Sequence, residues 1–127
     1  MQIEPTSRPE AVAEWPSDWM RAVLGIFTLR ALEYGPSYGY AIITALEGAG
    51  LGTVKGGTLY PLLGRYETAG LVSVEWRPGE GGPGRKYFAL TEQGRAELDR
   101  VRDDWEHFTT VSNTYLQHEP TSQRSDR

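Results

Sequence analysis

Apolar residues recur with a helical period in several stretches of this 127-residue chain. The clearest stretch spans residues 55–69, where the spacing of the apolar residues is i, i+3, i+4 and i+7. This spacing predicts a helix with one buried stripe, followed by Gly70 just past its end, where glycine favours the left-handed backbone. The stripe consists of Leu59, Leu62, Leu63 and Tyr66.

Two helices are expected ahead of this stretch. The first begins at Ser17, whose hydroxyl suits a helix cap, and ends at Gly35-Pro36. Its apolar arc covers most of its circumference, which indicates burial from more than one side and hints at a partner beyond this chain. The second begins at Ser37 and stops at the glycines that follow residue 47. The second and third helices, joined by a short glycine-containing turn, predict a helix-turn-helix.

The segment after the third helix decides the type of helix-turn-helix. Residues 71–77 and 85–90 read as two strands, and residues 78–84 between them are rich in glycine and proline, which predicts a hairpin loop. A helix-turn-helix followed by a two-stranded hairpin is the winged-helix arrangement. The expected fold is therefore mainly α with a small two-stranded β-wing, and the winged helix-turn-helix occupies residues 17–90.

A long amphipathic helix is expected over residues 91–116, beginning at Thr91. Its seam residues alternate steps of four and three, which is the heptad pattern of helices that pack against each other. A small domain cannot cover so long a helix, so the pattern favours a second copy of the chain as its cover. The flanking residues 1–16 and 117–127 read as a flexible arm and a disordered tail. The seam residues are Gly94, Leu98, Val101, Trp105, Phe108, Ser112 and Tyr115.

Composition first points away from nucleic acid. The chain has 13 basic and 17 acidic residues, a net charge of −4, whereas phosphate binding favours a basic surface. Residues 55–86 change this picture, because they hold five basic and three acidic residues and so carry +2, which leaves −6 for the rest of the chain. The positive charge therefore falls on the expected helix-turn-helix and wing. No stretch has the pattern of a secretory signal or a membrane span, so we expect a soluble, cytoplasmic protein.

Motifs that suggest catalysis do not hold in context. Residues 35–39 match the G-x-S-x-G of hydrolases, but that motif needs a preceding strand and a large sheet, and Ser37 is better explained as a helix cap. The glycines of residues 48–57 lack the Gly-Lys-Ser/Thr ending of a phosphate loop. His107 has no suitably spaced ligand partner, and the chain contains no cysteine. We therefore expect no enzyme activity, no metal and no cofactor.

Three motifs together resemble PadR-type transcriptional regulators. Residues 57–63, with Arg65, Glu67 and residues 70–72, resemble the family's recognition helix. Residues 35–40 resemble the start of its second helix, and residues 82–94 resemble its wing and the helix that follows. The resemblance runs from about Trp19 to Tyr115 and implies a homodimeric winged-helix repressor that binds pseudo-palindromic operators. In some members, a small, often aromatic, effector releases the DNA.

One departure from the family pattern affects how DNA would be read. The position before Arg65 often carries a long basic residue in the family, but here it is Gly64. The outward face of the third helix offers few side chains that can read bases, so we expect it to lie close to DNA, with phosphate contacts and DNA shape contributing most. The expected DNA-binding residues are Ser37, Tyr38, Lys55, Gly57, Thr58, Tyr60, Arg65, Arg85 and Lys86.

The last helix, together with the first, is expected to form the dimer. In multidrug-sensing members of the family a tryptophan of the last helix lines a pore at this interface, and Trp105 occupies the matching place. An aromatic effector would then contact Trp19, Trp105 and Phe108; the alternative is a dry interface core. Two other functions stay open: a small-molecule-binding module without operator binding, and a protein-interaction module. The expected interface residues are Trp19, Val23, Phe27, Leu98, Val101, Trp105, Phe108 and Tyr115.

Overall fold

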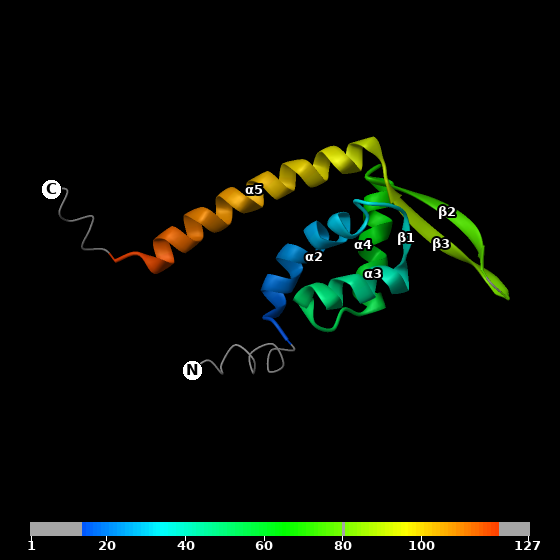
Figure 1. Ribbon diagram of the computed structural model, residues 1–127, viewed down its shortest axis with the longest axis horizontal. Coiled ribbons are helices and arrows are strands. Elements are labelled where there is room, and N and C mark those ends of the chain that lie inside the picture. The colour runs from blue at the N-terminus through cyan, green and yellow to red at the C-terminus, as the bar shows by residue number, and fades with distance from the viewer. Residues whose placement is uncertain (1–13, 80, 120–127) are drawn as a thin grey trace.

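A computed structural model describes residues 14–79 and 81–119. Three helices lie beside a three-stranded sheet, and a long final helix runs along this domain and past it (Figure 1). The predicted arm and tail fall largely outside the described residues. The elements are α2 (Ser17–Ala31), β1 (Ser37–Tyr38), α3 (Gly39–Leu46), a further helical turn η1 (Glu47–Leu51), α4 (Gly56–Thr68), β2 (Val72–Gly79), β3 (Gly82–Leu90) and α5 (Glu92–Gln117).

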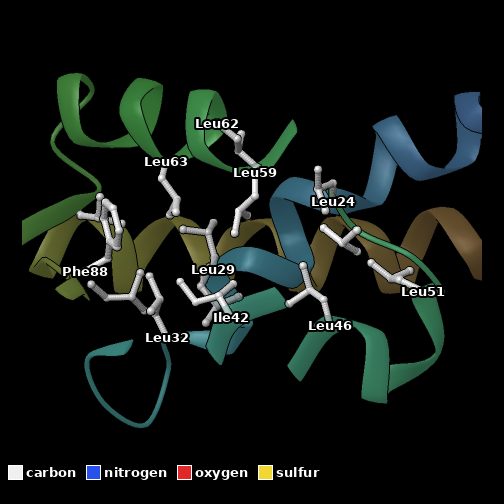
Figure 2. Packing of buried hydrophobic residues seen from close by; sticks show 14 residues of the cluster. Leu24, Leu29, Leu32, Ile42, Leu46, Leu51, Leu59, Leu62, Leu63 and Phe88 are labelled. Carbon is white, nitrogen blue, oxygen red and sulfur yellow. The ribbon is translucent and has the colours of Figure 1, made fainter. Parts of the chain in front are cut away.

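One hydrophobic cluster holds these elements together. Leu29 of α2, Ile42 of α3 and Leu59 of α4 are each at most 1% exposed and meet between the three helices (Figure 2). Phe88 of β3 and Leu98 of α5 close the same cluster from the sheet and from the final helix. The stripe predicted for the third helix is confirmed for its three leucines, which are buried. The core therefore fixes α4 against α2 and α3 and leaves its opposite face exposed.

The sheet corrects one prediction about the second helix. The strand order is β1-β3-β2, all antiparallel, with Ser37 opposite Phe88 and Tyr38 opposite Tyr87. Ser37 is therefore not the cap of a helix: it lies in a strand, and α3 begins at Gly39. The reason is a pairing with β3, about fifty residues further along the chain, which supplies backbone hydrogen bonds that no local pattern reveals.

The wing is longer than predicted. Residues 78–84 were expected to form a loop, but β2 continues to Gly79 and β3 begins at Gly82. Arg77 lies opposite Arg85, and the register shifts between residues 77 and 79. At Gly84, a Cβ atom would lie 2.7 Å from the carbonyl oxygen of Arg77, so only glycine lets the two strands approach here. The glycines therefore mark close strand contact as well as the turn.

Local signals at the helix ends are partly confirmed. Gly70 follows α4 with φ +81°, as predicted. The Thr91 hydroxyl accepts a hydrogen bond from the Gly94 amide (3.0 Å) and donates one to the Gly70 carbonyl (2.6 Å), which joins the start of α5 to the end of α4. Ser17, in contrast, is the first residue of α2 and makes no capping hydrogen bond. The Pro16 carbonyl accepts from the Trp19 and Met20 amides instead, at 3.0 Å each.

The final helix has 26 residues and two different environments. Its first turns bury Gly94 and Leu98 against the domain, whereas its end extends beyond α2 in Figure 1. Among the described residues, no helix has both the length and the hydrophobicity needed to cross a membrane.

Candidate nucleic-acid interface

The exposed face of α4 has a central strip with little side-chain bulk. Gly57, Pro61 and Gly64 are spaced i, i+4 and i+7, and all three are exposed. A Cβ atom on Gly57 or Gly64 would meet no other atom within 4 Å, so packing does not explain these glycines. At 100° per residue, Tyr60 borders one side of this strip, and Thr58 with Arg65 borders the other. A helix surface of this kind can approach a phosphate backbone closely.

Tyr60 reaches from α4 to the start of α3. A Cβ atom on Gly39 would collide with the Tyr60 hydroxyl and ring, which shows that the tyrosine lies directly across the first turn of α3. Tyr60 remains 50% exposed. No side chain caps α3, and its first turn contains no acidic residue. Gly39 is itself buried beneath Tyr60, so a half-exposed phenol lies directly over the positive end of α3, which is an arrangement that favours an anion near the Tyr60 hydroxyl.

Arg85 completes this group from the wing. Its guanidinium lies over the Tyr38 ring, 4.3 Å from the ring centroid, and Tyr38 is the residue immediately before α3. The stacking therefore holds the cation against the residue that precedes α3, before any ligand is bound. We define the anion site as Tyr38, Gly39, Tyr60 and Arg85.

A second cation extends the same sheet face. Arg77 lies over the Tyr87 ring at 4.3 Å, and Tyr87 packs edge-on against Tyr38 at 5.3 Å. Arg77 and Arg85 are direct cross-strand partners, an arrangement of like charges that destabilises a hairpin unless it is compensated. Stacking on the two tyrosines and an ion pair between Arg77 and Glu75 (3.6 Å) compensate here. The two arginines form a positive pair on the outward face of the wing.

The structure separates residues that the sequence had placed together. Arg85 and Lys86 are neighbours in β3, so their side chains lie on opposite faces of the sheet. Lys86 is on the face of the buried Phe88, with its ammonium 5.6 Å from that ring. Ser37 is also on the Phe88 face, because it is the cross-strand partner of Phe88. Of the predicted wing and strand residues, Tyr38 and Arg85 therefore lie together, whereas Ser37 and Lys86 lie on the other face.

Three further predicted residues face α2. Lys55, which immediately precedes α4, and Thr58 and Arg65 of α4 line a groove of about 530 Å³ between α2 and α4. Half-buried Tyr66 lies nearby and packs across Gly25 of α2, where a Cβ atom would collide with its hydroxyl. Burial raises the pKa of Tyr66, and the nearby Glu97 carboxylate raises it further, so this hydroxyl stays neutral. The expected phosphate contacts thus fall on both sides of the glycine strip.

Among the predicted interface residues, burial within the chain differs strongly. Leu98 is 2% exposed and is fully used by the core of its own chain, so we leave it out of any proposed interface. Val23, Phe27 and Val101 are partly buried against the same core. Trp105 is 37% exposed and packs on Phe108, with ring centroids 6.0 Å apart, while Trp19 stacks on Trp15 at 6.4 Å. Tyr115 is 82% exposed.

Sequence reasoning missed Arg77 and Tyr87 as members of the positive sheet face. Strand alternation alone would have placed Arg85 and Tyr87 on one face. The predicted loop of residues 78–84 also left Arg77 and Arg85 as the residues that flank it, so a signal that pairs Arg77 with Arg85 was present in the sequence. No group of three or more His, Cys, Asp or Glu side chains is arranged for a metal within the part of the chain that the structure describes.

Comparison with known proteins identifies the family to which this fold belongs. The model of the PadR-like transcriptional regulator family matches residues 28–100. A PadR-family regulator from Eggerthella lenta is 32% identical, with a TM-score of 0.73 over 80% of this chain and 88% of that one. A PadR-like regulator from Bacillus cereus is 30% identical, with a TM-score of 0.73 over 80% of this chain and 99% of that one. No curated protein matches the chain.

A more distant structure is that of Bacillus subtilis PadR in complex with operator DNA. It is 23% identical and has a TM-score of 0.56 over 77% of this chain and 48% of that one, a likeness that concerns the fold. The family match covers more than half of the sequence and includes α3, α4, the wing and the first part of α5. The chain is therefore a member of the PadR-like family of transcriptional regulators.

Proposed function

We propose that this regulator is a cytoplasmic homodimeric repressor that binds a pseudo-palindromic operator. One observation carries the proposal most directly: the anion site gathers Tyr60 of α4, Arg85 of the wing and the uncapped start of α3 on one surface. A DNA phosphate bound there would fix the glycine strip of α4 against the major groove. The operator complex solved for Bacillus subtilis PadR supports DNA as the partner of this fold.

A mobility-shift assay with the DNA upstream of the chain's own gene tests the proposal. We expect retardation at low micromolar protein, with a shallow salt dependence because each protomer offers few cations. Absence of salt-sensitive retardation on that region and on neighbouring promoters would contradict operator binding.

Arg85→Ala and Lys86→Ala form a matched pair for the anion site. Each removes one positive charge from β3, but only Arg85 lies over Tyr38. We expect Arg85→Ala to weaken DNA binding at least about tenfold and to lower the salt slope by about two, one for each protomer of the dimer, with a smaller change for Lys86→Ala. Dimer mass and circular dichroism should match the wild type. Equal losses in the two variants would show that the anion site is wrongly assigned.

Gly64→Ala tests the glycine strip. Since a Cβ atom meets open space at this position, alanine should stabilise α4 by up to about 1 kcal/mol and raise the melting temperature. The added methyl group would nevertheless hold the helix away from DNA, so affinity should fall while stability rises. If affinity is unchanged in this more stable variant, the strip does not face DNA.

The dimer would be formed by the end of α5 together with α2. Trp105, Phe108 and Tyr115 are exposed on one helix face in the single chain, which supports a second copy as their cover. In such a dimer the two α4 helices should lie about 34 Å apart, one turn of DNA.

Release of DNA by an aromatic effector would involve the tryptophans of this interface. The tilted Trp105–Phe108 pair, with Trp19 from α2, supports such a pocket only once the dimer forms. We expect planar aromatic compounds to quench tryptophan fluorescence, with the quenching lost in Trp105→Ala. An unchanged titration in Trp105→Ala would instead favour a dry interface.

A further inference from the structure

We propose that Glu33 is a positioning residue: it sets the angle between α5 and the winged-helix domain and thereby selects the spacing of the two operator half-sites. The angle is a property of the single chain. Its effect on half-site spacing rests on the proposed dimer and on the proposed operator binding.

Glu33 contacts α5 at two points that lie about two helical turns apart. Its backbone carbonyl accepts a hydrogen bond from Nη1 of Arg95 at 3.1 Å. Its carboxylate accepts one from Nη2 of Arg102 at 2.9 Å. Because Arg95 and Arg102 are seven residues apart, they lie on one face of α5, about 10 Å apart along the helix axis. One residue just after α2 therefore determines the direction of α5 as well as its distance from α2.

The Glu33 carboxylate is also held from the side of α2. Its other oxygen is buried and lies 3.3 Å from Nε of Arg30, which is in the last turn of α2. The Arg30 guanidinium in turn lies over the Tyr34 ring, 4.9 Å from the ring centroid. Only 21% of the Glu33 side chain is exposed, so water screens these charges less than it would screen a surface pair. The carboxylate thus connects a cation of α2 to a cation of α5.

The start of α5 is fixed separately, to the residues that follow α4. Thr91 donates its hydrogen bond to the Gly70 carbonyl at 2.6 Å. A Cβ atom on Gly94 would collide with the Leu71 carbonyl oxygen, so the first turn of α5 packs directly on that backbone. These contacts determine where α5 begins relative to α4, and the contacts of Glu33 determine in which direction it continues.

The length of α5 turns a small change of angle into a displacement that matters for DNA. Beyond Arg102 the helix continues to Gln117, about 22 Å at 1.5 Å per residue, and this end leaves the domain in Figure 1. A rotation of about 10° at Arg102 would move the helix end by about 4 Å relative to the domain, which is close to the rise of about 3.4 Å for one base pair. If this end packs on a second copy, the angle at Glu33 sets the separation of the two α4 helices.

Double electron–electron resonance measures the angle in the full-length chain. The chain contains no cysteine, so Gly48→Cys in η1 and Thr110→Cys in α5 carry the only two spin labels. A Cβ atom at Gly48 meets open space, and Thr110 is exposed. An excess of unlabelled chain restricts the measured distances to single protomers. We expect Glu33→Ala to shift or broaden the distance distribution by about 3 Å or more. An unchanged distribution would overturn the proposal.

Arg102→Ala and Arg100→Ala form a matched pair for this measurement. Each removes one exposed arginine from α5, so the fold should persist. Arg100 binds Glu97 and Asp104 of its own helix, whereas Arg102 binds Glu33. We expect Arg102→Ala to change the distances as Glu33→Ala does, Arg100→Ala to leave them unchanged, and Arg102→Lys to retain most of the original distribution. Equal changes in the two alanine variants would show that Glu33 does not set the angle.

Operators with one base pair added or removed between the half-sites test the selection of spacing. Wild-type protein should bind both altered operators at least about tenfold more weakly than the original one. Glu33→Ala and Arg102→Ala should reduce this ratio at least about threefold, and Arg100→Ala should retain it. A merely less stable protein would lose affinity for all three operators by the same factor, and this outcome would contradict the selection of spacing.

The two measurements separate this proposal from the proposed function. If no DNA is retained, operator binding fails, and the spin-label distances still decide whether Glu33 sets the angle. If the distances change and the operator ratio does not, selection of spacing by Glu33 is refuted. If the distances stay unchanged while operator DNA binds, the role of Glu33 is refuted and operator binding stands.

Discussion

The two halves of α5 share one sequence pattern and have opposite environments. In the first half, Leu98 is 2% exposed and lies in the core, and Arg102 donates a hydrogen bond to the Glu33 carboxylate (2.9 Å), which ties this half to the residues just after α2. In the second half, Phe108 is 60% exposed and Tyr115 is 82% exposed. The heptad spacing continues unbroken through both halves. A periodic apolar seam therefore identifies the helix face that packs against something. It does not show whether the packing partner is the same chain or another molecule.

Alanine substitutions in the two halves of α5 should differ most in how they change the free energy of unfolding. Leu98→Ala would leave a cavity in the core and should lower the free energy of unfolding by about 2–5 kcal/mol at any protein concentration. Phe108→Ala should leave the monomer fold intact and lower stability in a manner that depends on protein concentration, because it weakens association. Urea unfolding at two protein concentrations measures both effects. A concentration-independent loss in Phe108→Ala would show that the second half also packs within its own chain.

A charge on the exposed half should have an intermediate effect. Phe108→Arg would place an unpaired cation in the proposed interface and should weaken dimerisation by more than tenfold. Thr110→Arg is the matched control, because it adds the same charge on the opposite side of the helix. Analytical ultracentrifugation of both variants measures the dimer fraction. If Phe108→Arg sediments like the control, the end of α5 is not the dimer interface.

The smallest effect concerns the pH dependence of the first half. A hydrogen bond from Arg100 lowers the pKa of Glu97 below its ordinary value of 4.5. Since the unfolded chain then binds a proton more readily than the folded one, the pair stabilises the fold above pH 4.5 and loses this contribution as pH falls through the lowered pKa. Glu97→Gln should therefore make the melting temperature depend slightly less on pH below about pH 4.5. An unchanged acid profile would show that the pair contributes nothing measurable.

The sequence predicts well those features that neighbouring residues determine. The leucine stripe of α4, the positive φ of Gly70 and the Thr91 cap all follow from residues within one or two helical turns. The winged-helix order of elements also follows, because each element has its own local signal. Strand pairings between residues that are distant in the sequence are harder to predict. Ser37 looked like a helix cap because its partner Phe88 is distant in the sequence.

The candidate site shows the same limit. Lys55, Tyr60 and Arg85 could be selected by residue type and position in the expected wing and helix. The sequence could not show which of them lie together, since the stacking of Arg85 on Tyr38 depends on the β1–β3 pairing. Arg77 is a different case, because the predicted hairpin already places it opposite Arg85; what could not be predicted is that the two arginines stack on Tyr87 and Tyr38.

The β1–β3 pairing also has a consequence for the time course of folding. The helices can form from contacts between near neighbours, but Ser37 must find Phe88 across about fifty residues, which carries a substantial loop-closure entropy. Tyr38 and Arg85 meet only after that closure. A nascent chain would therefore acquire its helical core before its anion site, so that a chain still emerging from the ribosome cannot make the proposed phosphate contact until β3 has been synthesised and paired.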